Sequence, residues 1–240
     1  MQKSRAASPA TAMNLPSAPA PLPPINYSPP VGPLMIIYID DELIVLDKPA
    51  GLLSVPGRGP GHADSLATRV QVEFPDAQIV HRLDMATSGL IVMARGKEME
   101  RRLSIAFQQR RVEKCYVAVV AGHPQPEHGE IRLPLITDWP NRPRQKVDHE
   151  MGKPSLTAYQ LEAITPEDGT SRIRLYPHTG RSHQLRVHMQ AIGHPILGDE
   201  LYAPSPWREA SSRLLLHAES LSLPHPVTGE PLEMRSPAPF

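Results

Sequence analysis

The feature that most constrains the fold of this chain is a succession of short apolar runs. They occupy residues 36–39, 43–46, 90–93, 115–121, 156–163, 171–176 and 213–223. Runs of this length between turn-forming residues predict β-strands. Because these runs outnumber the helical patterns and several are joined by short turns, the sequence predicts an α+β fold. We expect a mixed, largely antiparallel sheet with a few flanking helices.

Helical spacing of apolar residues occurs in two segments. In 97–111 the other positions carry arginine and glutamine, which predicts an amphipathic helix with a partly basic outer face. In 182–192 the predicted inward stripe is Leu185, Met189 and Ile192, and Gly193 is expected to end the helix.

The first 33 residues differ in composition from the rest of the chain. They are rich in proline, alanine and serine, and such a stretch buries too little apolar surface to offset the entropy lost on ordering. The sequence therefore predicts a disordered arm over 1–33. The prolines argue against an amphipathic targeting helix, and no apolar core follows the charged start as in a secretory signal.

Cysteine content and hydropathy bear on the compartment. Cys115 is the one cysteine, which excludes an intrachain disulfide and fits a reducing compartment. No apolar stretch approaches the roughly 20 residues of a membrane helix. We therefore expect a cytoplasmic protein with no membrane segment.

Charge alone gives a weak argument against nucleic-acid binding. Lysine and arginine number 25, as do aspartate and glutamate, whereas nucleic-acid-binding domains are often basic. The arginines are unevenly distributed, with clusters at 101–102, 110–111 and 142–146. This distribution allows a local positive face on a neutral protein.

The polar stretch HRLDMATSGL at residues 81–90 is the main candidate functional motif. It places the carboxylate of Asp84 two residues after Arg82, in a turn that opens onto the apolar run 90–93. Catalytic groups tend to lie in such loops on a rigid scaffold. An aspartate before Thr-Ser-Gly is more often a cap or turn residue, so the motif alone leaves both interpretations open.

Six ordered blocks resemble the RluA family of pseudouridine synthases. HRLDMATSGL resembles the family's catalytic motif, DKPAGLL at 47–53 its preceding segment, and KCY at 114–116 its K-x-Y strand. TGRSHQLRVH at 179–188, GHPILGD at 193–199 and LLLHA at 214–218 follow in the family's order. The resemblance covers the chain from about residue 34 to its end. It implies the pseudouridine-synthase fold in 34–240, with no separate N-terminal RNA-binding domain.

The resemblance also implies the reaction, which isomerises uridine in RNA. The bond from ribose C1′ to N1 breaks, the base turns, and C1′ joins C5. No redox change occurs and no group is added, so no cofactor or metal is expected. The reaction needs one anionic group beside the ribose and the base. Three routes are open for this group: it adds to the base, attacks C1′, or takes a proton from C2′. The family pattern assigns that group to Asp84.

The family pattern gives further residues their expected roles. Arg181 is expected to pair with Asp84 and keep it ionised, and Arg82 to hold the target nucleotide out of its stack. Tyr116 is expected to pack against the target base, and a phenol can also act as a general acid or base. Ile196 and Leu215 match positions that line the apolar wall of the pocket.

The stretch DWPNRPRQK at 138–146 resembles the small RluA branch specifically. That branch is associated with large-subunit (23S) ribosomal RNA and with a transfer-RNA anticodon loop, so both are expected partners. Arg142, Arg144 and Lys146 are expected to contact RNA phosphates. We expect the enzyme to act as a monomer.

Two rival functions compete with this interpretation. A metal-dependent nuclease would use His178, His183, His188 and His194, but their spacings of five, five and six do not place them on one helix face. No HExxH-like pair or further cysteine ligand accompanies them, so no metal site is expected. An RNA-binding module without catalysis is the other rival, and the presence of Asp84, Tyr116 and Arg181 argues against it.

Overall fold

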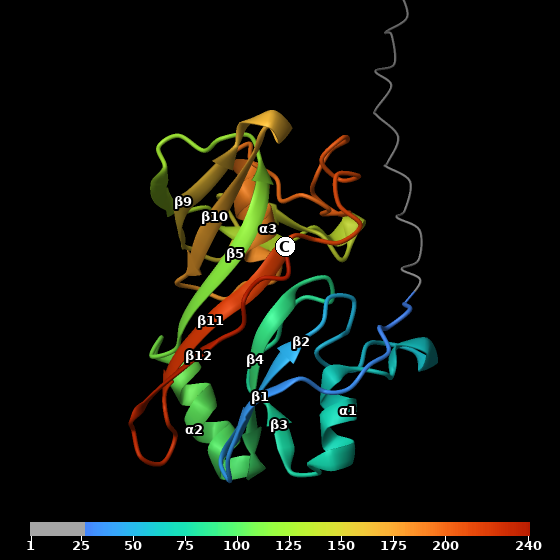
Figure 1. The fold of residues 1–240 in the computed structure, drawn as a ribbon, viewed down its shortest axis with the longest axis vertical. Helices are drawn as coiled ribbons and strands as arrows, with labels where there is room; N and C mark the ends of the chain where they lie inside the picture. The colour runs from blue at the N-terminus through green and yellow to red at the C-terminus, as the bar shows by residue number, and fades with distance from the viewer. Residues whose placement is uncertain (1–26) are drawn as a thin grey trace, which may run out of the picture.

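A ten-stranded sheet runs through the computed structural model, which describes residues 27–240 (Figure 1). Its strand order is β1-β2-β4-β11-β5-β10-β9-β6, with β12 beside β11 and β3 beside β4. The strands of this sheet are β1 (Ile36–Ile39), β2 (Leu43–Lys48), β3 (Ala77–Ile79), β4 (Ser88–Arg95), β5 (Glu113–Ala121), β6 (His128–Ile131), β9 (Thr157–Thr165), β10 (Thr170–Pro177), β11 (Leu216–Pro224) and β12 (Pro231–Arg235).

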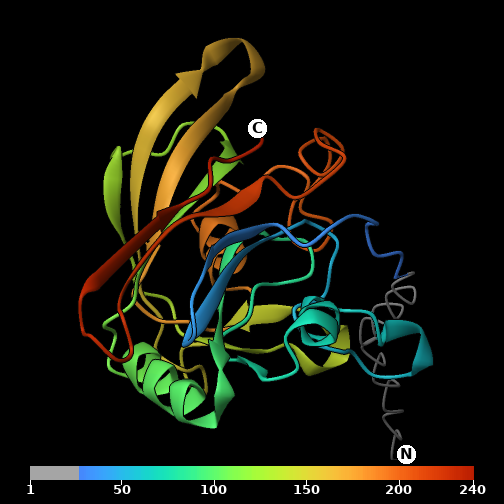
Figure 2. The ribbon, with the colours of Figure 1, turned by 60° about the horizontal axis from the view of Figure 1, so that its bottom comes forward.

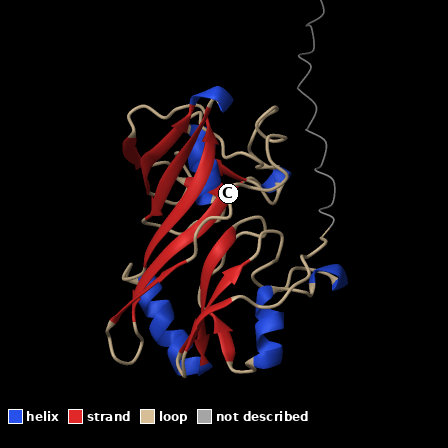
Figure 3. Cartoon of the chain, viewed as in Figure 1, coloured by secondary structure: helices blue, strands red, loops and turns tan. Residues whose placement is uncertain are grey.

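The helices and a separate ribbon complete the described part of the chain. The helices are α1 (Leu66–Glu73), α2 (Gly96–Gln108) and α3 (Gln184–Ala191), with single 3₁₀ turns η1 (Pro60–His62), η2 (Trp139–Asn141) and η3 (Pro166–Asp168). Strands β7 (Leu135–Thr137) and β8 (Gln145–Val147) pair as a two-stranded ribbon apart from the main sheet. Figure 3 shows the helices placed around this predominantly β structure. The α+β prediction is confirmed.

The N-terminal half of the sheet is buried on both faces. Alternate residues of β2 and β4 enter two different cores: Leu43 and Val92 pack with α2 and β12, whereas Ile44 and Ile91 pack with α1. Because successive side chains of a strand point to opposite faces, residues 43–46 of β2 and 90–94 of β4 are apolar without alternation. The result is a sheet with α1 on one face and α2 on the other.

The C-terminal half has its own core. Residues of β5, β9, β10 and β11 pack against α3, through Ile173, Leu185 and Met189 among others. Figure 2 shows the β9–β10 hairpin projecting beyond the rest of the sheet, and the far end of β9 is correspondingly exposed. The inward stripe predicted for α3 is confirmed, and Gly193 follows the helix with φ of 88°.

The two halves meet where β4 runs parallel to β11; the other strand pairs in the described residues are antiparallel. Gly89 has φ of 110°, and a Cβ there would lie 2.4 Å from the carbonyl oxygen of Ala218. Only glycine permits so close an approach of the two backbones. The glycine of the HRLDMATSGL motif therefore joins the two halves directly after the polar loop.

The predicted hairpin over 36–46 and the helix over 97–111 are confirmed as β1–β2 and α2. Helix α1, strands β3, β6 and β12, and the β7–β8 ribbon were not predicted. The boundary placed at residue 33 was too late, because the Tyr27 hydroxyl donates to Asp64 O at 2.8 Å and Pro30 O accepts from Arg69. The rest of the predicted arm lies outside the described residues. Within them, no helix combines the length and apolar character needed to cross a bilayer.

Candidate active site

A cleft of about 1610 Å³ opens between the two halves of the sheet. Its lining brings together segments far apart in the sequence: residues 79–87 before β4, the start of β5, the end of β10 with 178–183, the first turn of α3, 198–201 and 212–214. We refer to residues 80–87 as the Asp84 loop. Asp84, Arg82, Tyr116 and Arg181, predicted from sequence as site residues, all line this cleft.

Asp84 is held by an arginine of α3. Arg186 Nη1 donates to Asp84 Oδ2 at 3.3 Å, and the Asp84 side chain keeps 26% exposure. Arg186 is 5% exposed and also donates through Nε and Nη2 to both oxygens of buried Asp199, at 2.8 and 2.7 Å. Burial alone lowers the pKa of Arg186, but its hydrogen bonds with Asp199 outweigh that effect and raise it. A permanent cation therefore faces the Asp84 carboxylate.

The predicted pairing of Arg181 with Asp84 is wrong. The Arg181 side chain is exposed, and its Nε donates to the carbonyl oxygen of Pro154 at 3.4 Å. Helix α3 begins only at Gln184, after His183 with φ of 54°. That turn directs Arg181 to the rim of the cleft, while Arg186, inside the helix, faces Asp84.

The Asp84 loop is held by Lys48, in the segment 47–53 that resembled the family's DKPxGL stretch, and by Ser54 directly after that segment. Lys48 is fully buried, and its Nζ donates to the carbonyl oxygens of Pro49, Leu52 and Met85 at 2.9, 2.7 and 3.2 Å. Ser54 Oγ donates to Leu83 O and accepts from Leu83 N. These bonds determine where the carboxylate of Asp84 lies.

Burial also changes the titration of Lys48. Desolvation lowers the pKa of Lys48 to about 7, while the nearby Asp84 carboxylate opposes the change. The three carbonyl acceptors match the three N–H groups of an ammonium ion. Lys48 therefore contacts the backbone of the Asp84 loop at Met85, whereas Arg186 contacts the Asp84 carboxylate itself.

Tyr116 occupies β5, beside Leu175 and Ala218 of the neighbouring strands. The side chain is half-buried and packs between the cores of the two halves. Burial raises the pKa of Tyr116, and the Asp84 charge adds to the shift. The phenol is therefore protonated at neutral pH and offers the cleft a flat, neutral ring.

The four histidines considered as metal ligands do not converge. Thr157 and Leu133 O hydrogen-bond to His188, and Ala121 O to His194. His183 lies in the cleft, where its Nε2 is 4.0 Å from Asp84 Oδ1.

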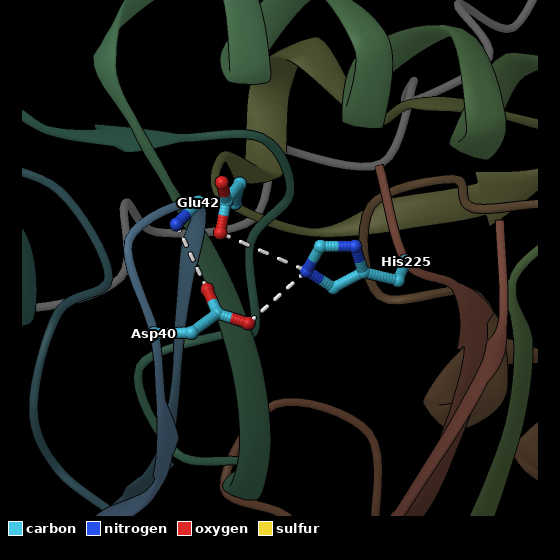
Figure 4. Close-up of side chains that lie close together, drawn as sticks. All are labelled: Asp40, Glu42 and His225. Carbon is cyan, nitrogen blue, oxygen red and sulfur yellow. Dashed lines mark hydrogen bonds and ion pairs between the residues drawn. The ribbon is translucent and has the colours of Figure 1, made fainter. Parts of the chain in front are cut away.

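A different group converges elsewhere: Asp40, Glu42 and His225 (Figure 4). His225 Nδ1 accepts from the backbone N–H of Val227 and Thr228, so Nε2 carries the proton. That proton is donated to Asp40 Oδ2 at 3.1 Å. This arrangement joins the β1–β2 turn to the β11–β12 turn and leaves no histidine lone pair for a cation.

Three comparisons place this chain among known proteins. The family model described as RNA pseudouridylate synthase matches residues 42–191. The Escherichia coli protein "Dual-specificity RNA pseudouridine synthase RluA" is 55% identical over 216 residues, covering 90% of this chain and 98% of the relative. The chain belongs to the RNA pseudouridylate synthase family. Its activity is the isomerisation of uridine to pseudouridine in RNA.

Further relatives agree with this assignment. The proteins of the same name from Pasteurella multocida and Yersinia pestis are 50% and 52% identical, covering 90% and 86% of this chain and 99% and 100% of their own. The solved structure of human RNA Pseudouridylate Synthase Domain Containing 1 superposes with a TM-score of 0.73 at 30% identity, covering 89% of this chain and 87% of that one. Human RNA Pseudouridylate Synthase Domain Containing 4 gives 0.69 at 25%, covering 85% and 88%.

Of the other predicted site residues, Arg82 lies in the cleft, whereas Ile196 and Leu215 do not. Arg82 is exposed at the cleft, with its side chain making no hydrogen bond inside residues 27–240. Ile196 and Leu215 do not line the cleft; both pack into the core behind β5 and α3. Leu214 and Leu216 line it instead, since neighbouring residues of an extended chain point to opposite sides.

The basic loop lies on the β7–β8 ribbon at the edge of the cleft, which Pro143 lines. Arg142 stacks over the Trp139 ring at 4.5 Å, and Trp139 remains 65% exposed. Lys146 lies 3.6 Å from Asp148. Arg144 is half-buried, and its Nε has no hydrogen-bond partner among the described residues. Arg142 and Lys146 are thus open to a ligand that approaches the cleft.

Sequence reasoning missed Arg186, Asp199, Lys48 and Ser54. Arg186 and Asp199 carried a signal, because each is a charged residue next to apolar residues, Arg186 between Leu185 and Val187 and Asp199 at the end of PILGD. A charge among core residues is rarely left without a partner. The two opposite charges could have been paired on that ground alone.

Proposed function

We propose that Asp84 is the catalytic carboxylate of this pseudouridine synthase. The observation that supports this most strongly is its placement: a partly exposed carboxylate in the cleft, with Arg186 on Oδ2 and the buried Lys48 beneath the loop. A carboxylate in a closed pocket is costly unless a cation accompanies it. The Arg186 guanidinium, and Lys48 in its ammonium form, supply positive charge next to the Asp84 loop.

The neighbouring residues then have separate tasks in the isomerisation. The C1′–N1 bond breaks, C1′ bonds to C5, the C5 proton leaves, and N1 takes up a proton, so the atoms of uridine and pseudouridine balance. Tyr116 packs against the base while it turns, which fits its neutral phenol. Arg82 enters the space that the flipped nucleotide leaves. Flipping the nucleotide costs a few kcal/mol, which the contacts to the enzyme offset. Arg186 takes over the role expected of Arg181.

We propose further that the substrates are large-subunit ribosomal RNA and the anticodon stem-loop of transfer RNA. Relatives at 50–55% identity across nearly their whole length are named as dual-specificity RNA pseudouridine synthases. The β7–β8 ribbon, which carries the stretch typical of that branch, borders the cleft where either RNA would enter.

Mapping pseudouridines in a strain that lacks this gene tests the choice of RNA. We expect sites to disappear from both 23S ribosomal RNA and transfer RNA, and to return with the wild-type gene but not with Asp84→Asn. Loss in only one class would limit the enzyme to that class. Loss in neither would contradict both substrates.

We also propose that the enzyme is a cytoplasmic monomer. The proposed substrates are cytoplasmic, and the single cysteine is buried and fits a reducing compartment. Size-exclusion chromatography with light scattering should give about the 26.5 kDa of one chain. A dimer mass at micromolar concentration would contradict the monomer.

A further inference from the structure

His183 occupies an unusual position directly before helix α3. Its φ of 54° places it in the left-handed region, which residues other than glycine seldom adopt. The side chain is 13% exposed, and its Nε2 lies 4.0 Å from Asp84 Oδ1. Arg186, three residues later, holds the other oxygen, Oδ2. The two residues thus face the two oxygens of one carboxylate.

A hydrogen-bonded chain fixes which ring nitrogen of His183 carries the proton. The Gln145 N–H donates to the Tyr202 hydroxyl oxygen at 2.8 Å, and that oxygen lies 2.7 Å from His183 Nδ1. The hydroxyl proton has no other acceptor in residues 27–240, so Tyr202 donates it to Nδ1. The neutral ring therefore carries its proton on Nε2, directed at Asp84.

Burial favours this neutral form of His183, although the Asp84 and Asp199 carboxylates nearby act against it. Asp84 faces it from the Asp84 loop, Arg186 from α3, and Asp199 and Tyr202 from the segment after α3. Burial lowers the pKa of His183, with Asp84 opposing and Arg186 reinforcing that change. Burial also raises the pKa of Tyr202 to about 12, so its hydroxyl keeps the proton it donates.

We propose that His183 is a positioning residue that holds Asp84 Oδ1 by donating from Nε2, and that Tyr202 links this contact to the β7–β8 ribbon. The proposal rests on the function proposed for Asp84. At 4.0 Å the contact is longer than a hydrogen bond, and active-site contacts of this kind tighten when substrate binds. Gln145 is the first residue of β8. RNA that binds the ribbon therefore affects the position of the Asp84 carboxylate through the contacts of Gln145 with Tyr202 and of Tyr202 with His183.

Nitrogen-15 NMR of histidine-labelled enzyme tests the chain of hydrogen bonds without RNA. We expect the His183 signals, assigned by their loss in His183→Gln, to show the tautomer with the proton on Nε2. Tyr202→Phe removes the donor to Nδ1 and should weaken that preference. A wild-type ring protonated on Nδ1 would overturn the proposal.

Turnover tests the consequence, measured as tritium release from transcripts of transfer RNA and 23S RNA labelled at uridine C5. Asparagine tolerates the left-handed backbone but is too short to reach Asp84, so His183→Asn should lower kcat about tenfold with little change in KM. Glutamine places an amide N–H near the position of Nε2, so His183→Gln should recover to within about threefold of wild type. The control is His194→Gln, a half-buried histidine outside the cleft.

The outcomes separate this proposal from the proposed function. If the wild-type enzyme turns over and His183→Asn is equally active, the role proposed for His183 is wrong. That result would not affect the role proposed for Asp84. A rise in KM alone would make His183 an RNA contact, which also overturns it. If the wild-type enzyme releases no tritium from either RNA, the proposed substrates are wrong. The proposal for His183 is then tested by the NMR measurement of its tautomer alone.

Discussion

At the scale of single residues, the electrostatics of the site depend on Arg186, whose guanidinium bridges Asp84 and Asp199. Arg186→Lys keeps the charge but removes the planar fork that reaches both carboxylates. We expect kcat to fall about tenfold or more, because the hydrogen bond to Asp84 is the longer one and breaks first. Tritium release at saturating RNA measures this effect.

Arg181→Lys is the matched control, since Arg181 lines the same cleft without touching Asp84. It should leave kcat nearly unchanged, and Arg181→Met should raise KM more than it lowers kcat. Should Arg181→Lys lower kcat more than Arg186→Lys does, the assignment of Arg186 as the partner of Asp84 would be wrong.

At the scale of secondary-structure elements, His81 joins the Asp84 loop to β4. Its Nε2 accepts from the Val92 N–H at 2.9 Å, and its ring stacks on Phe107. Burial lowers the pKa of His81 to about 3, and Lys114 adds to the effect. Between about pH 6.5 and 3 only the unfolded chain binds a proton here, so stability falls as the pH drops through that window.

Titration of His81 should lower the free energy of unfolding by about 3 kcal/mol when the pH falls from 7.5 to 4.5. His81→Gln keeps an acceptor for Val92 and does not titrate, so its stability should decrease less over that interval. Urea unfolding at the two pH values gives the difference, with the exposed His128→Gln as a control for the substitution. Equal acid sensitivity in wild type and His81→Gln would contradict this account.

The elements predicted correctly from sequence are those with clear periodicity. Residues 43–46 of β2 and 90–94 of β4 are continuously apolar because both faces of the sheet are covered there, and α2 has one apolar side. Helix α1 was missed because its buried residues are few and its capping box pairs Ser65 with Thr68 instead of the usual glutamate or glutamine. Strand β12 was missed because it begins at a proline and is mostly exposed.

The position of Asp84 in the site was predictable, but its partner was not. Arg181 and Arg186 lie in one motif, and the left-handed turn at His183 decides which of them reaches the carboxylate. No pattern in the sequence requires a histidine to adopt that backbone conformation. Leu215 failed as a wall residue because a shift of one residue along an extended chain exchanges the cleft for the core. Ile196 packs in that core, and neither of its neighbours lines the cleft.

At the scale of the whole molecule, a neutral chain presents a locally positive cleft. Its lining includes Arg82, Arg110, Lys114, Arg181 and Arg213, and the basic loop of the ribbon lies at its edge. Neutralising Arg142, Arg144 and Lys146 together should weaken RNA binding. The slope of log Kd against log salt should fall by roughly 0.7–0.9 for each phosphate that the variant no longer binds.

Fluorescence anisotropy over a salt series measures that slope. Neutralising Arg101 and Arg102 of α2, which pair with Glu98 outside the cleft, provides a control of similar charge. An unchanged slope and affinity for the loop variant would show that the ribbon does not contact RNA.

The central claim is that the carboxylate of Asp84 carries out the isomerisation, and Asp84→Asn tests it most directly. The amide is nearly isosteric but cannot supply the anion, so fold and RNA affinity should persist. Tritium release from C5-labelled RNA should fall by more than about a thousandfold, a barrier increase of at least ~4 kcal/mol. Residual turnover above about one percent of wild type would contradict the assignment of Asp84 as the catalytic group.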